Sequence, residues 1–271
     1  MTTRLVLAGC GNMGYAMLGG WLKSGKLKAT DVLVVEPNEA LRRRAEDLGC
    51  PTVSEAGAIA AGASPEIVVL AVKPQVIRKV TEEYKHFGNG RTTFLSVVAG
   101  TPVATFEQIL GTRTPVMRCM PNTPAAIGKG MMVVYPSPLV SAKTRGFIAD
   151  LLSASGEVAT VDNESLMDAV TAVSGSGPAY VFHFIECLTA AAEEAGLPTE
   201  TAKLLARQTV YGAASLAAES KDDPGTLRQQ VTSPNGTTAA ALGVLMGEDR
   251  LKTLVIEAVE AARVRSMELG E

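Results

Sequence analysis

The sequence predicts an α/β fold in which a doubly wound parallel sheet is followed by a region made only of helices. Three observations lead to this prediction. A strand, a glycine turn and a helix follow one another at the start of the chain, and strand and helix patterns then alternate. From residue 163 onward, long alanine-rich helical patterns replace the apolar runs that are typical of strands. We therefore expect two domains, 1–162 and 163–271.

The first element is a strand at 5–8, and a helical pattern extends from 15 to 22. Between them, Gly9, Gly11 and Gly14 have the spacing G-x-G-x-x-G, which is the entry to a Rossmann-type dinucleotide-binding unit. The first glycine permits the tight turn, the second lets the backbone approach a pyrophosphate, and the third lets the helix lie close to the strand. The alternative is a glycine-rich turn that binds no ligand.

The second strand, 32–35, ends at Glu36, and Asn38 can cap the helix that follows. An acidic residue at this position is where the adenosine ribose 2′-hydroxyl is held in dinucleotide-binding folds. Because no arginine follows in the sequence before Arg42, we expect NADH to be used at least as well as NADPH. A solvated charge at a strand end is an equally open interpretation of Glu36.

The alternation continues through the rest of the first domain. The expected strands are 51–53, 67–72, 93–98, 116–119, 131–135 and 156–161, and the expected helices are 55–61, one that opens at Pro74, and 141–153. In a parallel sheet the ligand lies beyond the carboxyl ends of the strands. The turns at 73–74, 99–102 and 120–124 are therefore expected to line the cofactor cleft.

The C-terminal region is expected to contain the helices 164–173, 177–195, 199–219, 224–231, 237–246 and 249–269. These helices carry more apolar surface than about 110 residues can bury, so we expect a partner subunit to cover part of it. The segments 174–180 and 231–238 each open a helix with glycines and hydroxyl side chains. Both are candidate carboxylate sites, because free amides and the helix dipole attract an anion, although ordinary capping explains them equally well.

Composition excludes several classes of partner. A net charge of −3 gives no electrostatic basis for binding nucleic acid or an anionic membrane. No apolar run has the length of a membrane-spanning helix, and Arg4 within the first strand pattern argues against a signal peptide. The four cysteines form no C-x-x-C pair, so we expect free thiols in a reducing cytoplasm, with no metal site and no disulfide.

With these motifs assembled, the chain resembles the pyrroline-5-carboxylate reductases, which catalyse the last step of proline synthesis, over essentially its full length. The matching segments are 9–13, 71–74, 118–124, 173–180 and 233–238. The last two are specific to this family, whereas the first is shared by many dehydrogenases. The resemblance implies an N-terminal NADPH- or NADH-binding domain and a helical domain that interlocks with its mate in a homodimer. In this family, dimers often associate further into a decamer of five dimers.

The resemblance also implies the functional residues. The cofactor would be bound by the three glycines with Asn12, Met13, Glu36, Ala71, Val72, Lys73, Pro74, Ala99, Gly100, Met120, Pro121 and Asn122. The pyrroline carboxylate would be bound by Ser174, Gly175, Ser233, Pro234, Asn235, Gly236, Thr237 and Thr238. A solvated side chain for Lys73 and a purely packing role for Met120 are the simpler alternatives.

The expected reaction moves a hydride from the nicotinamide to the carbon of a cyclic C=N bond, and orientation supplies most of the acceleration. Thr238 is the candidate that hydrogen-bonds the ring nitrogen, directly or through water. Two departures from the family pattern stand out. Asn235 replaces a glycine common in relatives and must accept the backbone conformation of glycine, and Glu36 with Val35 replaces residues typical of NADPH-binding relatives.

Two other functions remain as alternatives. A β-hydroxyacid dehydrogenase needs a general-base lysine with asparagine four residues later, and none of Lys203, Lys221 and Lys252 has asparagine at that spacing. A nucleotide sensor without catalysis is the second alternative, because fold alone does not determine function.

Overall fold

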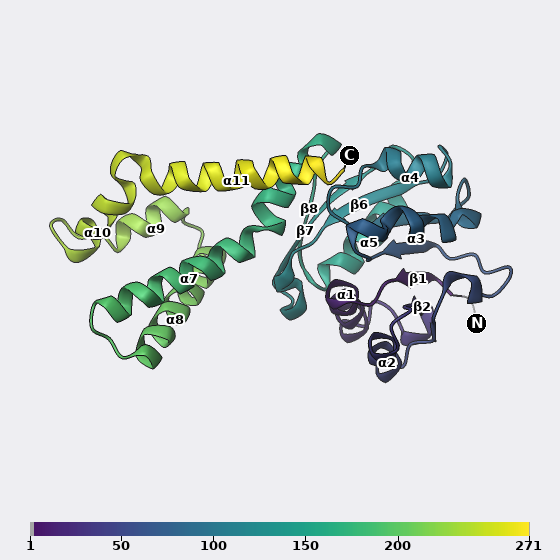
Figure 1. Cartoon of the computed structure of the whole chain (residues 1–271), viewed down its shortest axis with the longest axis horizontal. Helices are drawn as coiled ribbons and strands as arrows, with labels where there is room; N and C mark the ends of the chain where they lie inside the picture. Colours follow the sequence, from purple (N-terminus) through teal and green to yellow (C-terminus); the bar gives the residue numbers. More distant parts are fainter. Residues whose placement is uncertain (1–2, 271) are drawn as a thin grey trace. The chain divides into compact units, whose positions relative to one another are not determined.

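The computed structural model of the chain describes residues 3–270. Its strands form one eight-stranded sheet in the order β3-β2-β1-β4-β5-β6-β7-β8. Figure 1 labels β1, β2, β6, β7 and β8 of this sheet. The strands are β1 Leu5–Ala8, β2 Val32–Val35, β3 Thr52–Val53, β4 Ile67–Leu70, β5 Thr93–Ser96, β6 Val116–Met120, β7 Gly130–Pro136 and β8 Gly156–Thr160. The strand order reverses between β1 and β4, as in doubly wound folds, so the predicted Rossmann-type sheet is confirmed.

One strand departs from the predicted parallel arrangement. β1 to β6 pair in parallel, but β7 runs antiparallel to β6, and β8 is again parallel to β7. The connection 121–129 contains only a 3₁₀ segment, Thr123–Ile127, and is too short for the crossover that a parallel neighbour needs. A chain this short can only turn back, which reverses the direction of the strand.

The sheet is covered by helices on both faces. These helices are α1 Asn12–Lys23, α2 Glu39–Asp47, α3 Ile77–Glu83, α4 Val103–Leu110 and α5 Ala142–Ser153. Alternate residues of β1 point to opposite faces: Leu5 and Leu7 pack with α1, α2 and α5, whereas Val6 and Ala8 pack with α3 and α4. Burial on both faces explains the nearly continuous apolar runs of the strands.

Several predicted boundaries in this part of the chain were wrong, and the strand expected at 93–98, for example, ends at Ser96. The helix expected at 55–61 is only a 3₁₀ turn, Ala56–Ala58, because the segment contains Gly57, is followed by Gly62 and has no apolar periodicity. The strand expected at 67–72 ends at Leu70, and the chain turns before the 3₁₀ segment Pro74–Val76 that leads into α3.

The chain divides into two compact units, which we describe separately. The sheet unit comprises residues 1–176 and 262–271, and the helical unit comprises residues 177–261. The remaining helices are α6 Met167–Val170, α7 Gly177–Glu194, α8 Thr199–Glu219, α9 Pro224–Gln230, α10 Thr237–Met246 and α11 Arg250–Glu268. The last turns of α11 therefore belong to the sheet unit. The division expected from sequence, 1–162 and 163–271, remains a prediction about functional domains.

The helix expected at 164–173 consists of three different helical segments. A 3₁₀ segment, Glu164–Leu166, is followed by α6 and then by a π-helical turn, Thr171–Gly175. The π-helix occurs mostly as single turns within α-helices, and these turns are frequent at functional sites. This turn contains Ser174 and Gly175, both of which the sequence marked as candidate substrate residues.

The helical unit has almost no core of its own. Among its hydrophobic residues, all of which the structure describes, only Ala202 and Ala206 are buried. Large apolar side chains are exposed on its helices, among them Phe182, Phe184 and Ile256. An apolar surface of this extent indicates that another molecule covers it. No helix among residues 3–270 is both long enough and apolar enough to cross a membrane.

Candidate cofactor and substrate site

The glycine turn after β1 has a geometry that depends on glycine at two positions. Gly9 has a φ of +94°, and a Cβ atom there would lie 2.5 Å from the carbonyl oxygen of Ala71. A Cβ atom on Gly14 would overlap the carbonyl oxygen of Gly9, so this glycine allows α1 to approach the turn. At Gly11 a Cβ atom would meet nothing within 4 Å. The open side of Gly11 is therefore where a ligand can approach the backbone.

The first turn of α1 is free to bind an anion. Gly11 is the N-cap residue and supplies no side-chain bond, and the first turn contains no acidic residue. The first N–H groups of a helix have no partner within the helix, and its dipole places partial positive charge there. A pyrophosphate fits this position, because the space beside Gly11 and the free amides coincide.

Glu36 lies at the end of β2 beside this turn. Its carboxylate accepts hydrogen bonds from the backbone N–H of Cys10, at 2.8 Å, and of Asn38, at 2.9 Å. The residue is 6% exposed and lines a cavity of about 570 Å³ together with Gly9 and Gly11. The interpretation of Glu36 as a solvated surface charge is therefore wrong. The carboxylate fixes the glycine turn from the side of β2.

Arg42 is closer to Glu36 than the sequence spacing indicates. The first turn of α2 brings the guanidinium back, so that Nη1 donates to the carbonyl oxygens of Glu36, at 2.9 Å, and of Pro37, at 3.1 Å. Lys79 lines the same cavity from α3. Arg42 itself does not line the cavity, so the cavity combines the acid Glu36, which fits a free 2′-hydroxyl, with the lysines Lys73 and Lys79, which fit a 2′-phosphate.

The turns after β4, β5 and β6 lie side by side at the carboxyl ends of three neighbouring strands. The register aligns Leu70 with Ser96 and Ser96 with Arg118, so the residues beyond each strand emerge side by side. Among the predicted cofactor residues, Ala71, Val72 and Lys73 line the cavity that holds Glu36. Asn12 and Met13 line a separate groove of about 1180 Å³, and Pro74 lines a small cavity of about 110 Å³.

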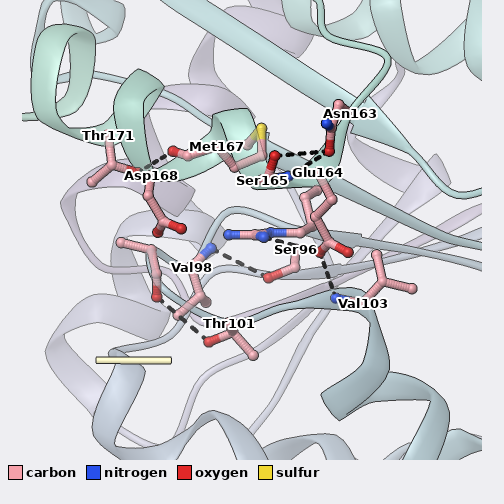
Figure 2. Close-up of polar contacts among 12 residues, drawn as sticks. Ser96, Val98, Thr101, Val103, Asn163, Glu164, Ser165, Met167, Asp168 and Thr171 are labelled. Atoms are coloured by element: carbon pink, nitrogen blue, oxygen red, sulfur yellow. Dashed lines mark hydrogen bonds and ion pairs between the residues drawn. The ribbon is translucent and has the colours of Figure 1, made fainter. Parts of the chain in front are cut away.

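The turn after β5 is held from both sides. Gly100 has a φ of +72°, and a Cβ atom there would lie 3.0 Å from Leu269 Cβ and from the carbonyl oxygen of Ser266. The hydroxyl of Ser266 donates to Asp168 Oδ1 at 2.7 Å. On the other side, the backbone N–H of Val103 donates to Glu164 Oε1 at 2.7 Å (Figure 2).

The turn after β6 is tied to the π-helical turn. Asn122 Oδ1 accepts the backbone N–H of Met131 at 2.9 Å, which leaves the amide Nδ2 to donate to the carbonyl oxygen of Ser174 at 3.2 Å. A Cβ atom on Gly175 would overlap the terminal methyl of Met120. The structure therefore brings predicted cofactor residues and predicted substrate residues into contact within the sheet unit.

The segment 233–238 belongs to the helical unit. The backbone N–H of Gly236 donates to the carbonyl oxygen of Ser233 at 3.1 Å, which closes a tight turn. Asn235 has a φ of 59°, so it adopts the left-handed conformation expected where relatives carry glycine. α10 begins without a side-chain cap, and the half-buried Thr238 lies in its first turn. The first backbone N–H groups of α10 are therefore free to bind an anion.

One group of residues beside the turn after β5 was not predicted from the sequence. Arg118 and Glu164 form an ion pair, with Nη1 2.9 Å from Oε1, beside the turn after β5. A signal was present, because a charged residue within an apolar strand needs a partner, and Arg118 interrupts the run Val116–Met120. The partner itself was not predictable, because it lies 46 residues away in the chain.

The thiols show no sign of activation. Cys10, Cys50 and Cys119 are buried, and only Cys187 is exposed among the described cysteines. Burial, with the nearby Glu36 charge, raises the pKa of Cys10 to about 11. No group of three or more histidine, cysteine or acidic residues within 3–270 is arranged to hold a metal ion.

Comparison with known proteins covers both parts of the chain. Residues 164–269 match the family model for pyrroline-5-carboxylate reductase dimerisation, and residues 4–100 match the model for NADP oxidoreductase, coenzyme F420-dependent. A pyrroline-5-carboxylate reductase from Pseudomonas aeruginosa is 40% identical over 270 residues, which span 100% of this chain and 98% of the relative. The chain belongs to the pyrroline-5-carboxylate reductase family. The resemblance inferred from the motifs is thereby confirmed.

Other members of the family are similar to this chain in sequence and structure over nearly its whole length. The pyrroline-5-carboxylate reductase of Escherichia coli is 35% identical and fully covered. The structure of a pyrroline-5-carboxylate reductase from Coxiella burnetii superposes with a TM-score of 0.92 at 34% identity and 100% coverage of both chains. The Plasmodium falciparum enzyme, whose structure has NADP bound, has a TM-score of 0.85 at 28% identity and covers 99% of this chain. Family membership makes the chain an NAD(P)H-dependent oxidoreductase.

Proposed function

We propose that this chain reduces the C=N bond of 1-pyrroline-5-carboxylate to L-proline with a hydride from NAD(P)H, as the final step of proline biosynthesis. The full-length match to the reductase family carries this proposal. The anion-binding turn at Gly11 and the acidic residue at the end of β2 support it, because both have the geometry that a dinucleotide needs.

In this proposal the cofactor lies across the carboxyl ends of the parallel strands. NAD(P)H would supply the hydride, and the protein would bind and orient it. The glycine turn and the start of α1 would hold the pyrophosphate, and Glu36 would accept a bond from the ribose. The turns after β4, β5 and β6 would form the nicotinamide side, with Ala99, Gly100, Met120, Pro121 and Asn122.

The substrate carboxylate and ring would be held by the segment 233–238 together with Ser174 and Gly175. The uncapped start of α10 supports this assignment, because its amides favour an anion. Thr238 would donate to or accept from the ring nitrogen, directly or through water. The bond that Asn122 makes to Ser174 would keep the nicotinamide side and the substrate side in register.

The active form is proposed to be a homodimer, with a decamer of five dimers as the larger assembly. The nearly coreless helical unit supports a dimer, because two copies can bury each other's apolar helices. The reaction belongs to biosynthesis, so we place the protein in the cytoplasm. The domain roles follow the expected division: residues 1–162 bind the dinucleotide, and residues 163–271 bind the substrate and dimerise.

The direct test is reduction of the cyclic imine by the purified chain, with NADH and NADPH supplied separately. We expect oxidation of the cofactor that depends on the imine and forms L-proline. Gly11→Leu fills open space without a clash, so this variant should fold normally but lose cofactor binding. A folded wild-type chain that binds the cofactor but does not reduce the imine would leave only the sensor function.

A further inference from the structure

Arg118 is a buried cation on a central strand. It lies on β6 and is 5% exposed. Its Nη1 donates to Glu164 Oε1 at 2.9 Å, while its Nε has no hydrogen-bond partner among the described residues. A buried guanidinium that lost its carboxylate would be left uncompensated, so the position of Glu164 is strongly fixed by Arg118.

Glu164 passes this constraint on to the turn after β5. The same Oε1 atom accepts the backbone N–H of Val103 at 2.7 Å. Val103 is the first residue of α4, and Pro102 at the N-cap provides no side-chain bond. The carboxylate of Glu164 thus replaces the missing cap and favourably meets the dipole of α4. Val103 is only three residues beyond Gly100, so the cap fixes the end of the turn.

The other contacts of this turn come from the same part of the chain. Asp168 lies four residues after Glu164, and it holds Ser266, whose carbonyl oxygen faces Gly100. Figure 2 shows Glu164 and Asp168 on one segment, next to the turn that includes Val98 and Thr101. All of these residues belong to the sheet unit. The turn is therefore clamped by residues of the region that matches the dimerisation family model.

We propose that the Arg118–Glu164 pair is a positioning device for hydride transfer, in which it fixes the turn 99–102 against the nicotinamide. This inference rests on the proposed function, which assigns Ala99 and Gly100 to the cofactor. Hydride transfer requires a near-attack arrangement of the reacting atoms, and a displacement of about 1 Å can reduce the rate on the order of 100-fold. Loss of the cap frees the turn to shift.

The device acts on only one end of the cofactor. The adenosine end is assigned to the separate cavity with Gly9, Gly11 and Glu36, and neither Arg118 nor Glu164 lines that cavity. Release of the turn should therefore weaken the binding of the nicotinamide and slow hydride transfer, and it should leave the binding of ADP-ribose unchanged. A purely structural role would instead reduce both kinds of binding together.

The test compares Glu164→Ala and Glu164→Gln with Glu66→Ala in the full-length protein. Glu66 forms another arginine–glutamate pair of the sheet unit, with its Oε1 3.0 Å from Arg4 Nε, and serves as the control. For each protein we would measure kcat, the isotope effect with 4-deuterated NADH, the Kd values for NADH and ADP-ribose, and the oligomeric state.

For Glu164→Ala we expect kcat to fall at least about tenfold and the deuterium isotope effect to rise. The Kd for NADH should rise, and the Kd for ADP-ribose should stay within about twofold of wild type. Glu164→Gln keeps an oxygen for the N–H of Val103 and should recover part of the rate. Glu66→Ala should match wild type.

Two results would overturn the proposal. One is a kcat for Glu164→Ala within about twofold of wild type, and the other is a parallel loss of ADP-ribose binding or of the oligomer. If Glu164→Ala does not fold, Glu164→Gln decides by the same comparison of kcat and the two Kd values. A wild-type chain that does not reduce the imine refutes the proposed function instead, and the ratio of the NADH and ADP-ribose affinities still tests the clamp.

Discussion

Glu36 gives the sharpest test of how the cofactor is chosen. The substitution Glu36→Gln keeps the size of the side chain and removes its charge. In the structure the two carboxylate oxygens accept bonds from Cys10 N–H, at 2.8 Å, and Asn38 N–H, at 2.9 Å. A glutamine retains one acceptor and turns an amide toward the other N–H, which should lower the stability by about 1–3 kcal/mol.

The effect on selectivity follows from the charge. A carboxylate about 4 Å from one charge of a 2′-phosphate opposes it by about 1 kcal/mol in water and by about 4 kcal/mol in a partly buried site. About 1.4 kcal/mol corresponds to a tenfold change in rate. Glu36→Gln should therefore raise the ratio of kcat/KM for NADPH to kcat/KM for NADH by at least about tenfold.

The assay is imine reduction with each cofactor, for wild type, Glu36→Gln and the control Glu55→Gln. Glu55 lines the same cavity but is exposed, so the control should leave the ratio unchanged. An unchanged ratio for Glu36→Gln would refute the role of the carboxylate. A wild-type preference for NADPH above about 30-fold, or about 2 kcal/mol, would equally contradict it and would point to Arg42 as the dominant residue.

Three further predictions concern the helical unit. Thr238→Ala should fold and bind NADH but lose roughly 10- to 100-fold in kcat/KM for the imine. Thr238→Ser, which keeps the hydroxyl, should recover most of this loss. If kcat/KM of Thr238→Ala stays within about twofold of wild type, Thr238 is a structural residue. Sedimentation at micromolar concentration should show a stable oligomer, and a stable, active monomer would contradict the covering of the apolar helices. Asp223 caps α9, and its pKa is lowered by hydrogen bonds from the Thr226 hydroxyl, the Thr226 N–H and the Gly225 N–H. The ionised cap therefore stabilises the folded protein fully at pH values above the ordinary pKa of aspartate. This stabilisation is lost as the pH falls through the lowered pKa of the folded state. Asp223→Ala should accordingly lower Tm near neutral pH but not in strong acid, and an equal loss at both pH values would refute the linkage.

Sequence patterns predicted the features that depend on local chemistry. The glycines of the first turn, the apolar strands and the end of β2 each have a short-range physical cause, and the structure confirms their positions. The left-handed conformation of Asn235 was also predictable, because asparagine is the residue that best replaces glycine there.

What the sequence did not predict depends on contacts between distant segments. β7 was expected to be parallel to β6, but the length of the connection decides its direction. The separation of Arg42 from Glu36 in the sequence hid their contact across the first turn of α2. The pairing of Arg118 with Glu164 joins two segments that no local pattern links, although the charge of Arg118 within a strand required some partner.

The most direct test of the central claim follows the hydrogen atom itself. The purified protein is incubated with 1-pyrroline-5-carboxylate and NADH or NADPH that carries deuterium at the transferable position of C4, and the proline is analysed by mass spectrometry and chiral chromatography. The account predicts L-proline with one deuterium at C5, because the hydride passes directly from the nicotinamide to the imine carbon. Proline without deuterium, or oxidation of the cofactor without proline, would contradict it.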